Sequence, residues 1–194
     1  AKADESPIGK VVAVRGNVEA IDDMDNRRRL VLKDPVYVSD TVETGSGRIQ
    51  LMFRDNTLVS LGRITTAKIA AYAWEPDKDN AAMTLDVKEG GFRVMGGAIT
   101  RKAPENFKTN TPSGTIGIRG SMYAGLVRAN TLSVIFQGGK GIYVQNDIGR
   151  VDIETPGFGT VVNNPEKPPS PPEKMSGEEL TAFENLTARS SEVK

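Results

Sequence analysis

Hydrophobic and polar residues alternate along most of the chain, in short runs separated by Gly, Asn and Asp. A period of two is typical of β-strands that bury one face, whereas amphipathic helices repeat every 3.6 residues. The pattern is clearest in residues 115–154, where we predict five short strands. Their apolar positions are Ile116 and Ile118; Met122, Ala124 and Leu126; Leu132, Val134 and Phe136; Ile142 and Val144; Val151 and Ile153.

The first half of the chain has the same pattern. Its apolar runs are KVVAVRG, NVEAI, RLVLKD, VYV, RIQLMF and LVSLG, with polar turns at DDMDN and RDNT. Residues 83–99 predict two strands around a turn at Gly90–Gly91. Residues 64–74 have the length of a short helix, but their β-branched start favours a strand. We therefore predict an all-β domain over residues 1–162, a twisted solenoid-like or barrel-like sandwich.

An internal repeat supports this prediction. Residues 12–34 align without a gap on residues 116–138, so that Arg15 matches Arg119 and Gly16 matches Gly120. The apolar positions of the two segments also coincide. We interpret the match as a duplicated unit of short strands, which must stack on its neighbour to bury its apolar face.

The composition changes after residue 162. Residues 163–174 contain five prolines and predict an extended linker or arm. Within residues 175–194, Ser176 and Glu179 form a capping-box pattern, which predicts a short amphipathic helix from about residue 177 to 188. Its apolar positions, Leu180, Phe183 and Leu186, form a possible interface because so short a helix is marginal unless it packs on something.

Composition narrows the possible functions. The 194 residues include 25 Lys and Arg against 25 Asp and Glu, which argues against a nucleic-acid partner. No stretch is apolar enough to predict a membrane span. Cysteine and histidine are absent, which excludes disulfides, thiolate metal sites and catalysis by histidine. We predict a non-enzymatic protein with no catalytic residues, no cofactor and no metal site.

The first residues, AKADESP, lack an initiating Met and resemble the end left by signal-peptide removal. A trimmed recombinant end is the alternative. We predict an extracytoplasmic protein, either periplasmic or secreted to the cell surface.

Arg119, between Gly117 and Gly120, is the most conspicuous candidate site residue. An arginine flanked by glycines could clamp a carboxylate or phosphate. It could instead pair with a carboxylate at a tight strand crossing. We favour this structural role, because the same Arg-Gly pair recurs as Arg15–Gly16 in the other copy of the repeat.

Other polar groups are weaker candidates. The segments 22–26 and 77–80 offer oxygen ligands suited to calcium, but β-turns explain both. Four acids, Asp22, Asp55, Asp86 and Glu154, could pair in a glycoside hydrolase, although the sequence fixes no distance between them. The basic run 26–30 is interpreted as a solvated hairpin, and the glycines of 138–141 as a turn rather than a phosphate loop.

The sequence also resembles the FecR domain family. The resemblance rests on Thr111–Pro112, on IGIRG at residues 116–120 and on Tyr123, preceded by a Thr-Gly turn in VETGSGRIQLMFRDNTLVSLG and by GGFRVMGGAITRKAPENF. It covers roughly residues 8–160. It implies an exported all-β domain that contacts partner proteins, best known in regulators that link outer-membrane transporters to sigma factors. The chain looks like a stand-alone member, without the transmembrane and sigma-binding segments of such regulators.

These observations favour a non-catalytic interaction or self-assembly module, and head-to-tail assembly of such a module would give filaments. Its expected partner is a second copy of the chain or another envelope protein. The segment SPIGKVVAV or the C-terminal arm could be donated as a strand to a neighbour. The alternatives are a regulatory or sensory domain that binds a transporter or signalling partner, and a glycan-binding module.

Overall fold

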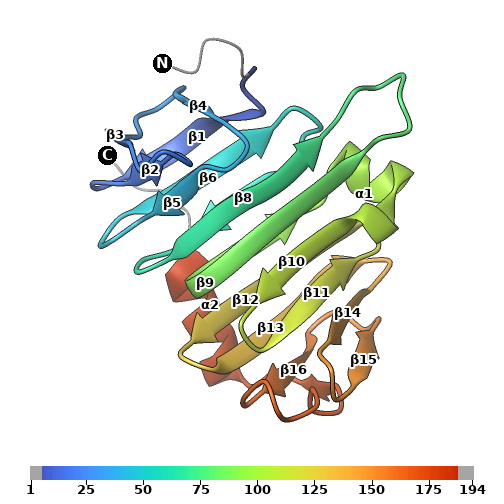
Figure 1. Cartoon of the computed structure of the whole chain (residues 1–194). Coiled ribbons are helices and arrows are strands. Elements are labelled where there is room, and N and C mark those ends of the chain that lie inside the picture. The colour runs from blue at the N-terminus through green and yellow to red at the C-terminus, as the bar shows by residue number, and fades with distance from the viewer. Residues whose placement is uncertain (1–5, 188–194) are drawn as a thin grey trace.

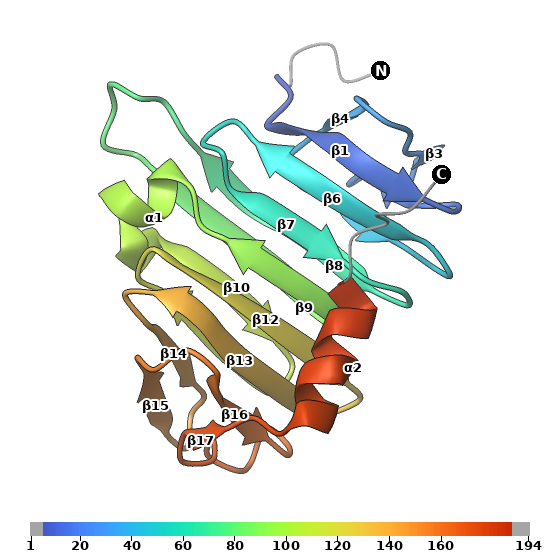
Figure 2. The same ribbon diagram turned by 180° about the vertical axis from the view of Figure 1, so that it is seen from behind.

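The computed structural model describes residues 6–187, which fold into two stacked β-sheets (Figures 1 and 2). The front sheet, which faces the viewer in Figure 1, contains in spatial order β3 (Arg27–Arg29), β2 (Glu19–Ile21), β5 (Thr41–Glu43), β8 (Thr66–Ala73), the first half of β9 (Ala82–Met95), β10 (Phe107–Thr111), β11 (Gly114–Ile118), β14 (Ile142–Gln145) and β15 (Arg150–Ile153).

The back sheet faces the viewer in Figure 2. It contains in spatial order β4 (Pro35–Val36), β1 (Gly9–Arg15), β6 (Arg48–Phe53), β7 (Leu58–Leu61), the second half of β9, β12 (Ser121–Arg128), β13 (Thr131–Gly139), β16 (Phe158–Val162) and β17 (Glu173–Lys174). The predicted all-β class and the predicted strands of residues 115–154 are confirmed, and residues 64–74 supply strand β8 rather than a helix.

Strand β9 belongs to both sheets. Its first half pairs with β8 and β10, and its second half pairs with β7 and β12. The chain bends between the sheets at Gly90, whose φ of 103° favours glycine and whose Cα faces Thr65 too closely for a Cβ. The prediction of two strands around a turn at Gly90–Gly91 was therefore wrong. The glycines bend one long strand.

The two sheets do not close into a barrel. Among the described residues, β3 pairs only with β2, and β15 pairs only with β14, so the front sheet ends in two strands with unpaired outer edges. The fold is therefore an open, two-layered arrangement rather than a closed barrel. Nearly all pairings are antiparallel, but β10 runs parallel to β9. That pairing follows a connection through α1 (Ala98–Lys102) and the 3-10 turn η1 (Pro104–Asn106).

The core lies between the sheets. Most of the alternating apolar positions of both sheets point inward and form one continuous cluster. In β12 the inward residues are Tyr123 and Val127, whereas the predicted apolar positions Ala124 and Leu126 lie on the outer face under α2. Its largest fully buried side chains are Tyr123, Phe53, Phe92, Phe107 and Phe136. Each such side chain contributes about 1.5–3 kcal/mol through burial, so the inward faces supply most of the stability.

The C-terminal segment packs on part of the back sheet. Helix α2 (Gly177–Thr187) lies across its outer face (Figure 2), where Phe183 and Met175 pack on Ala124 and Ile135. The predicted capping box is present: Ser176 N–H donates to Glu179 Oε2 at 2.7 Å, and Glu179 N–H donates to Ser176 Oγ at 3.3 Å. The helix predicted from the sequence is confirmed.

The Pro-rich arm runs along the outer edge of β16. Ser170 N–H donates to the Val161 carbonyl at 2.9 Å, and Thr160 Oγ1 donates to the Ser170 carbonyl at 2.6 Å. Strand β17 then pairs with the start of β16. The arm is therefore docked on its own chain.

Both Arg-Gly pairs of the predicted repeat lie where the chain crosses between the sheets, although the two crossings run in opposite directions. The chain passes from the back sheet to the front sheet after β1, and from the front sheet to the back sheet between β11 and β12. Gly16 and Gly120 mark these crossings, and each has a φ of 78°. The shared left-handed conformation explains why glycine recurs in both copies.

A buried aspartate ties α1 to both sheets. Asp55 is 1% exposed and accepts hydrogen bonds from Tyr72 Oη at 2.8 Å, Thr57 Oγ1 at 2.7 Å and the backbone N–H of Ile99 at 3.0 Å. Burial and the bond to Asp55 raise the pKa of Tyr72. Helix α1 has no side-chain cap from a neighbouring residue. One of its free amides is satisfied instead by Asp55, which lies 44 positions earlier in the sequence.

Candidate functional site

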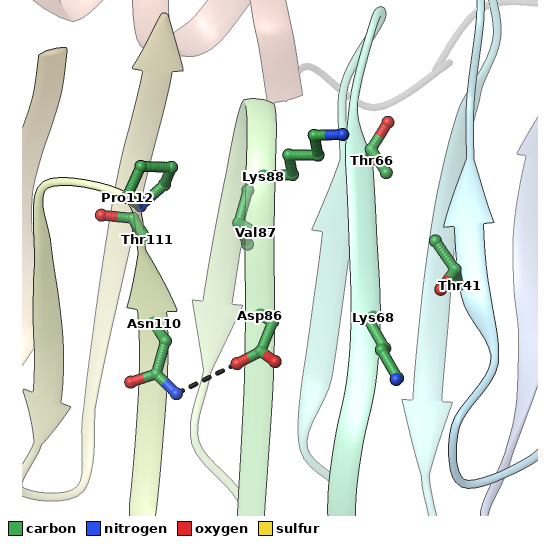
Figure 3. A pocket seen from close by; sticks show the side chains of 9 residues that line it. All are labelled: Thr41, Thr66, Lys68, Asp86, Val87, Lys88, Asn110, Thr111 and Pro112. Atoms are coloured by element: carbon green, nitrogen blue, oxygen red, sulfur yellow. Dashed lines mark hydrogen bonds between the residues drawn. The ribbon is translucent and has the colours of Figure 1, made fainter. Parts of the chain in front are cut away.

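The outer face of the front sheet carries a groove over β5, β8, β9 and β10 (Figure 3). We call it the front groove. It encloses about 510 Å³. Its lining residues are Thr41, Thr66, Lys68, Asp86, Val87, Lys88, Asn110, Thr111 and Pro112.

Strand register places the groove floor in one row across the sheet. Thr41 lies opposite Lys68, Lys68 opposite Asp86, Asp86 opposite Asn110, and Asn110 opposite Thr115. Thr115 Oγ1 donates to Asn110 Oδ1 at 3.0 Å, and Asn110 Nδ2 donates to Asp86 Oδ1 at 3.0 Å. This chain of hydrogen bonds fixes the orientation of the Asp86 carboxylate.

The two lysines of the groove, Lys68 and Lys88, differ from Asp86. Within the part of the chain that the structure describes, neither Lys68 nor Lys88 has an ion pair. Lys88 is the extra residue of a β-bulge, because Thr66 pairs with Glu89 while the next residue, Ala67, pairs with Val87. Bulges redirect side chains, and here the bulge leaves Lys88 exposed beside the groove.

The family motif Thr111–Pro112 forms the end wall of the groove. Thr111 Oγ1 donates to the Gly114 carbonyl at 2.8 Å and accepts from the Gly114 N–H at 3.2 Å, which closes the turn between β10 and β11. Strand β10 therefore stops at this point while β9 continues. The groove lies where the two strands part.

Arg119 lies outside the front groove, near the edge strand β15. Its guanidinium contacts Asp152 at 2.9 Å and Glu154 at 3.5 Å. Asp152 also accepts from Arg150 at 2.9 Å, and this bond lowers the pKa of Asp152, with a smaller contribution from Arg119. Arg119 thus pairs with two carboxylates at this edge of the front sheet.

Gly117 belongs to the same surface. The ring of Tyr143 lies directly over it, so that a Cβ at Gly117 would be 1.9 Å from the ring. The guanidinium of Arg150 stacks on the ring at 4.0 Å from its centroid. Gly117 is needed here for the close approach of an aromatic ring.

The other predicted candidates are scattered over the fold. Arg15 lies opposite Arg48 at the end of β1, next to the crossing at Gly16. Asp22 caps the β2–β3 turn by accepting from the amides of Met24 and Asn26, and Glu154 pairs with Arg119. Segment 77–80 lies in the β8–β9 connection. No group of three potential metal ligands occurs among the residues that the structure describes.

The predicted interface on α2 faces partly inward. Phe183 is 3% exposed and packs on the back sheet, while Leu180 is 36% exposed. The side chain of Leu186 lies outside the described residues.

Sequence reasoning singled out Thr111, Pro112 and Asp86 but missed Lys68, Lys88 and Asn110 as site residues. In the sequence each is an ordinary polar position of an alternating strand. Only the register across four strands brings them together.

Comparison with known proteins decides the family. A family model for FecR protein matches residues 40–139, which include every lining residue of the front groove and the turn at Thr111–Pro112. The chain belongs to the FecR family. No curated protein sequence matches it.

Two solved structures share the FecR fold of this chain. Both are crystal structures of a candidate anti-sigma factor from Parabacteroides distasonis ATCC 8503, at 1.65 Å and 2.50 Å resolution, with 16% sequence identity. Their TM-scores are 0.56 and 0.58, over 74% of this chain and 63% of each relative. The chain thus spans less than two thirds of these relatives. None of the helices that the structure describes is long and apolar enough to span a membrane.

Proposed function

We propose that this FecR protein is a non-catalytic, extracytoplasmic interaction domain that acts in regulation or sensing by binding a partner protein. Membership of the FecR family and the fold shared with a candidate anti-sigma factor support a regulatory role. The polar groups that the structure describes support a binding role, since they are engaged in turns, ion pairs and the groove rather than in an arrangement of acid, base and nucleophile.

The observation that carries this proposal is the pair of open edges on the front sheet. In β3, the bonds between Asp22 and Asn26 and between Leu30 and Val18 fix the hydrogen-bonding pattern. The backbone groups of Arg27 therefore point away from β2, as do those of Arg29. Unpaired edges of this kind accept an added strand from another chain.

The second open edge has the same pattern. The bond from Asn146 N–H to the Gly149 carbonyl fixes the register of β14 and β15. The backbone groups of Arg150 and Asp152 consequently point outward.

Exposed apolar side chains flank both edges. Met24, which is 70% exposed, precedes β3 in the sequence. Val31 and Leu32, which are 49% and 56% exposed, follow β3. Ile148, which is 55% exposed, precedes β15. Apolar side chains beside an unpaired strand supply the hydrophobic contacts that backbone pairing alone lacks.

The sequence favoured self-assembly through a segment donated to a neighbouring copy. Both candidate donor segments instead pair within their own chain, which makes this route less favourable. SPIGKVVAV contributes β1, which pairs with β4 and β6, and the C-terminal arm covers β16. We therefore favour a partner that brings its own strand. Self-assembly is the second candidate, because β3 and β15 lie at opposite ends of the front sheet and could pair between copies (Figure 1).

Site-specific photocrosslinking in the producing bacterium tests the proposal. A photoreactive residue at Val31 or Ile148 should give one discrete adduct, whereas the same residue at Glu166, exposed on the docked arm, should give none. An added mass of 20.9 kDa would identify a second copy of the chain, and any other mass a different partner. Absence of adducts at both edges, or equal adducts at Glu166, would overturn the proposal.

A proline variant separates strand addition from general stickiness. Arg29→Pro removes an N–H that points outward and leaves the pairing with β2 intact. It should strongly reduce the adduct at Val31. Arg29→Ala, which keeps the N–H, should preserve it.

A further inference from the structure

We infer that the front groove binds a short acidic peptide segment, whose carboxylates lie between Lys68 and Lys88. The inference rests on the proposed function, since it assigns part of a partner's contact to this groove. It concerns a different surface from the open edges of β3 and β15.

The charges of the groove carry the inference. Lys68 and Lys88 come from neighbouring strands, project from the same face (Figure 3) and are free of ion pairs within the described chain. The nearby acid Glu43 is held by Arg27 at 3.0 Å. The two ammonium groups are therefore available to an incoming carboxylate.

The polar floor favours a peptide over a phosphate. The Asp86 carboxylate, fixed by Asn110, would repel a multiply charged phosphate but can accept a backbone N–H. The hydroxyls of Thr41 and Thr66 can donate or accept. A peptide offers carboxylates to the lysines and amides to Asp86, so it matches both signs of charge.

The dimensions fit about four residues. The groove crosses β5, β8, β9 and β10, and three inter-strand spacings of about 4.8 Å give roughly 14 Å. An extended chain advances about 3.4 Å per residue, so about four residues span the groove. Alternate side chains of such a segment would face the sheet.

The bulge at Lys88 gives this strand a feature that regular pairing would not produce. Regular alternation would send every second residue of β9 inward, yet Lys88 and Glu89 are both exposed. The extra residue therefore places an ammonium group beside the gap where β10 stops. An outer sheet face with only a structural role does not require this bulge.

Nuclear magnetic resonance titration with defined peptides tests the inference. The probe is acetyl-Glu-Glu-Glu-Glu-amide, with the tetraglutamine analogue and inorganic phosphate as comparisons. We expect the glutamate peptide to shift the backbone amide resonances of Lys68, Asp86, Lys88 and Asn110 in a saturable way. The glutamine peptide should shift them little.

Lysine variants supply the matched control. Lys68→Gln combined with Lys88→Gln should weaken binding of the glutamate peptide at least tenfold. Lys108→Gln, an exposed lysine on the same face of β10 but outside the groove, should change it less than twofold. Equal weakening in the control, equal shifts with phosphate, or no saturable shift would each overturn the inference.

The two proposals fail separately. Edge adducts at Val31 or Ile148 without peptide binding would remove the groove inference and leave the interaction proposal standing. Peptide binding without edge adducts would remove strand addition and leave the groove as the recognition surface.

Discussion

The front and back sheets share one core but have different outer surfaces. Part of the outer face of the back sheet is covered by α2, and the outer edge of β16 by the Pro-rich arm. Within residues 6–187, the front sheet has a polar outer face, a groove whose two lysines have no ion pair, and two open edges. The contrast is consistent with the proposal that recognition belongs to the front sheet, since the apolar residues Ala124 and Ile135 of the back sheet are covered while Lys68 and Lys88 of the front sheet are exposed.

This contrast matters because open edges usually endanger a β protein. Here the open strands β3 and β15 carry charged residues, such as Arg27 and Asp152, which discourage indiscriminate pairing. The exposed apolar residues stand beside these strands rather than on them. Such an arrangement permits a selective partner.

The largest expected difference comes from replacing one buried aspartate and one aspartate of the front groove. Asp55→Ala removes a buried acceptor of hydrogen bonds from Tyr72, Thr57 and Ile99. It should lower the free energy of unfolding by about 3 kcal/mol or more, because it leaves buried donors unsatisfied. Asp86→Ala in the front groove should cost about 1 kcal/mol at most. Urea unfolding measures both, and equal losses would contradict the division between layers.

A pair of glycine variants gives a smaller effect. Gly125→Ala in β12 places a Cβ 2.4 Å from the ring of Phe92, which is fully buried and packs edge-on against Tyr123. We expect a loss of about 2–3 kcal/mol from overpacking, measured by urea unfolding. Gly117→Ala meets the ring of Tyr143, which is only partly buried and can move toward solvent, so its cost should be about 1 kcal/mol. A larger loss at Gly117 would show that the front face is as tightly packed as the core.

The cover on the back sheet gives a smaller effect again. Phe183→Ala should cost about 1–2 kcal/mol in urea unfolding, less than a full core truncation, because α2 can detach while the sheets remain folded. It should also increase self-association in light scattering, since Ile135 and Ala124 become exposed. Leu180→Ala on the outer side of α2 is the matched control and should change neither measurement. Unchanged association in Phe183→Ala would mean that the covered patch is not adhesive.

Acid should weaken the front edge slightly. The lowered pKa of Asp152 means that its bond to Arg150 stabilises the folded state fully above the ordinary aspartate value of 3.8. This contribution is lost as the pH falls through the lowered folded value. Because the pair is largely exposed, the effect should be small and should decrease with salt. The difference between wild type and Asp152→Asn in thermal unfolding should therefore shrink below pH 3.8; a constant difference would exclude the ion pair as its cause.

Local patterns predicted the strands well because each depends only on its own alternation. The five strands of residues 115–154 and the capping box at Ser176 are of this kind. Helix α1 could not be predicted, since its five residues lack a cap and depend on Asp55, whose bond to Ile99 joins residues 44 positions apart. The role of Gly90 was ambiguous in the sequence, because a glycine with a positive φ is found both in turns and where a strand bends.

The candidate site was harder to predict than the fold. Thr111 and Pro112 stood out as a motif, and Asp86 as an acid, but nothing local connects Asp86 to Lys68. Their adjacency follows from the register of β8 and β9, and that of Asn110 from the parallel pairing after α1. Pairing between distant strands is a tertiary property, and one sequence does not reveal it.

The prolines of the arm have a consequence for growth of the sheets. A prolyl nitrogen carries no hydrogen, so the stretch that covers β16 can receive hydrogen bonds but offers few donors on its far side. In the language of polymerisation, the back sheet carries a chain terminator at that end, while the front sheet keeps two ends that can be extended. Any fibre built from this protein would therefore run continuously through one layer and be interrupted in the other at every joint.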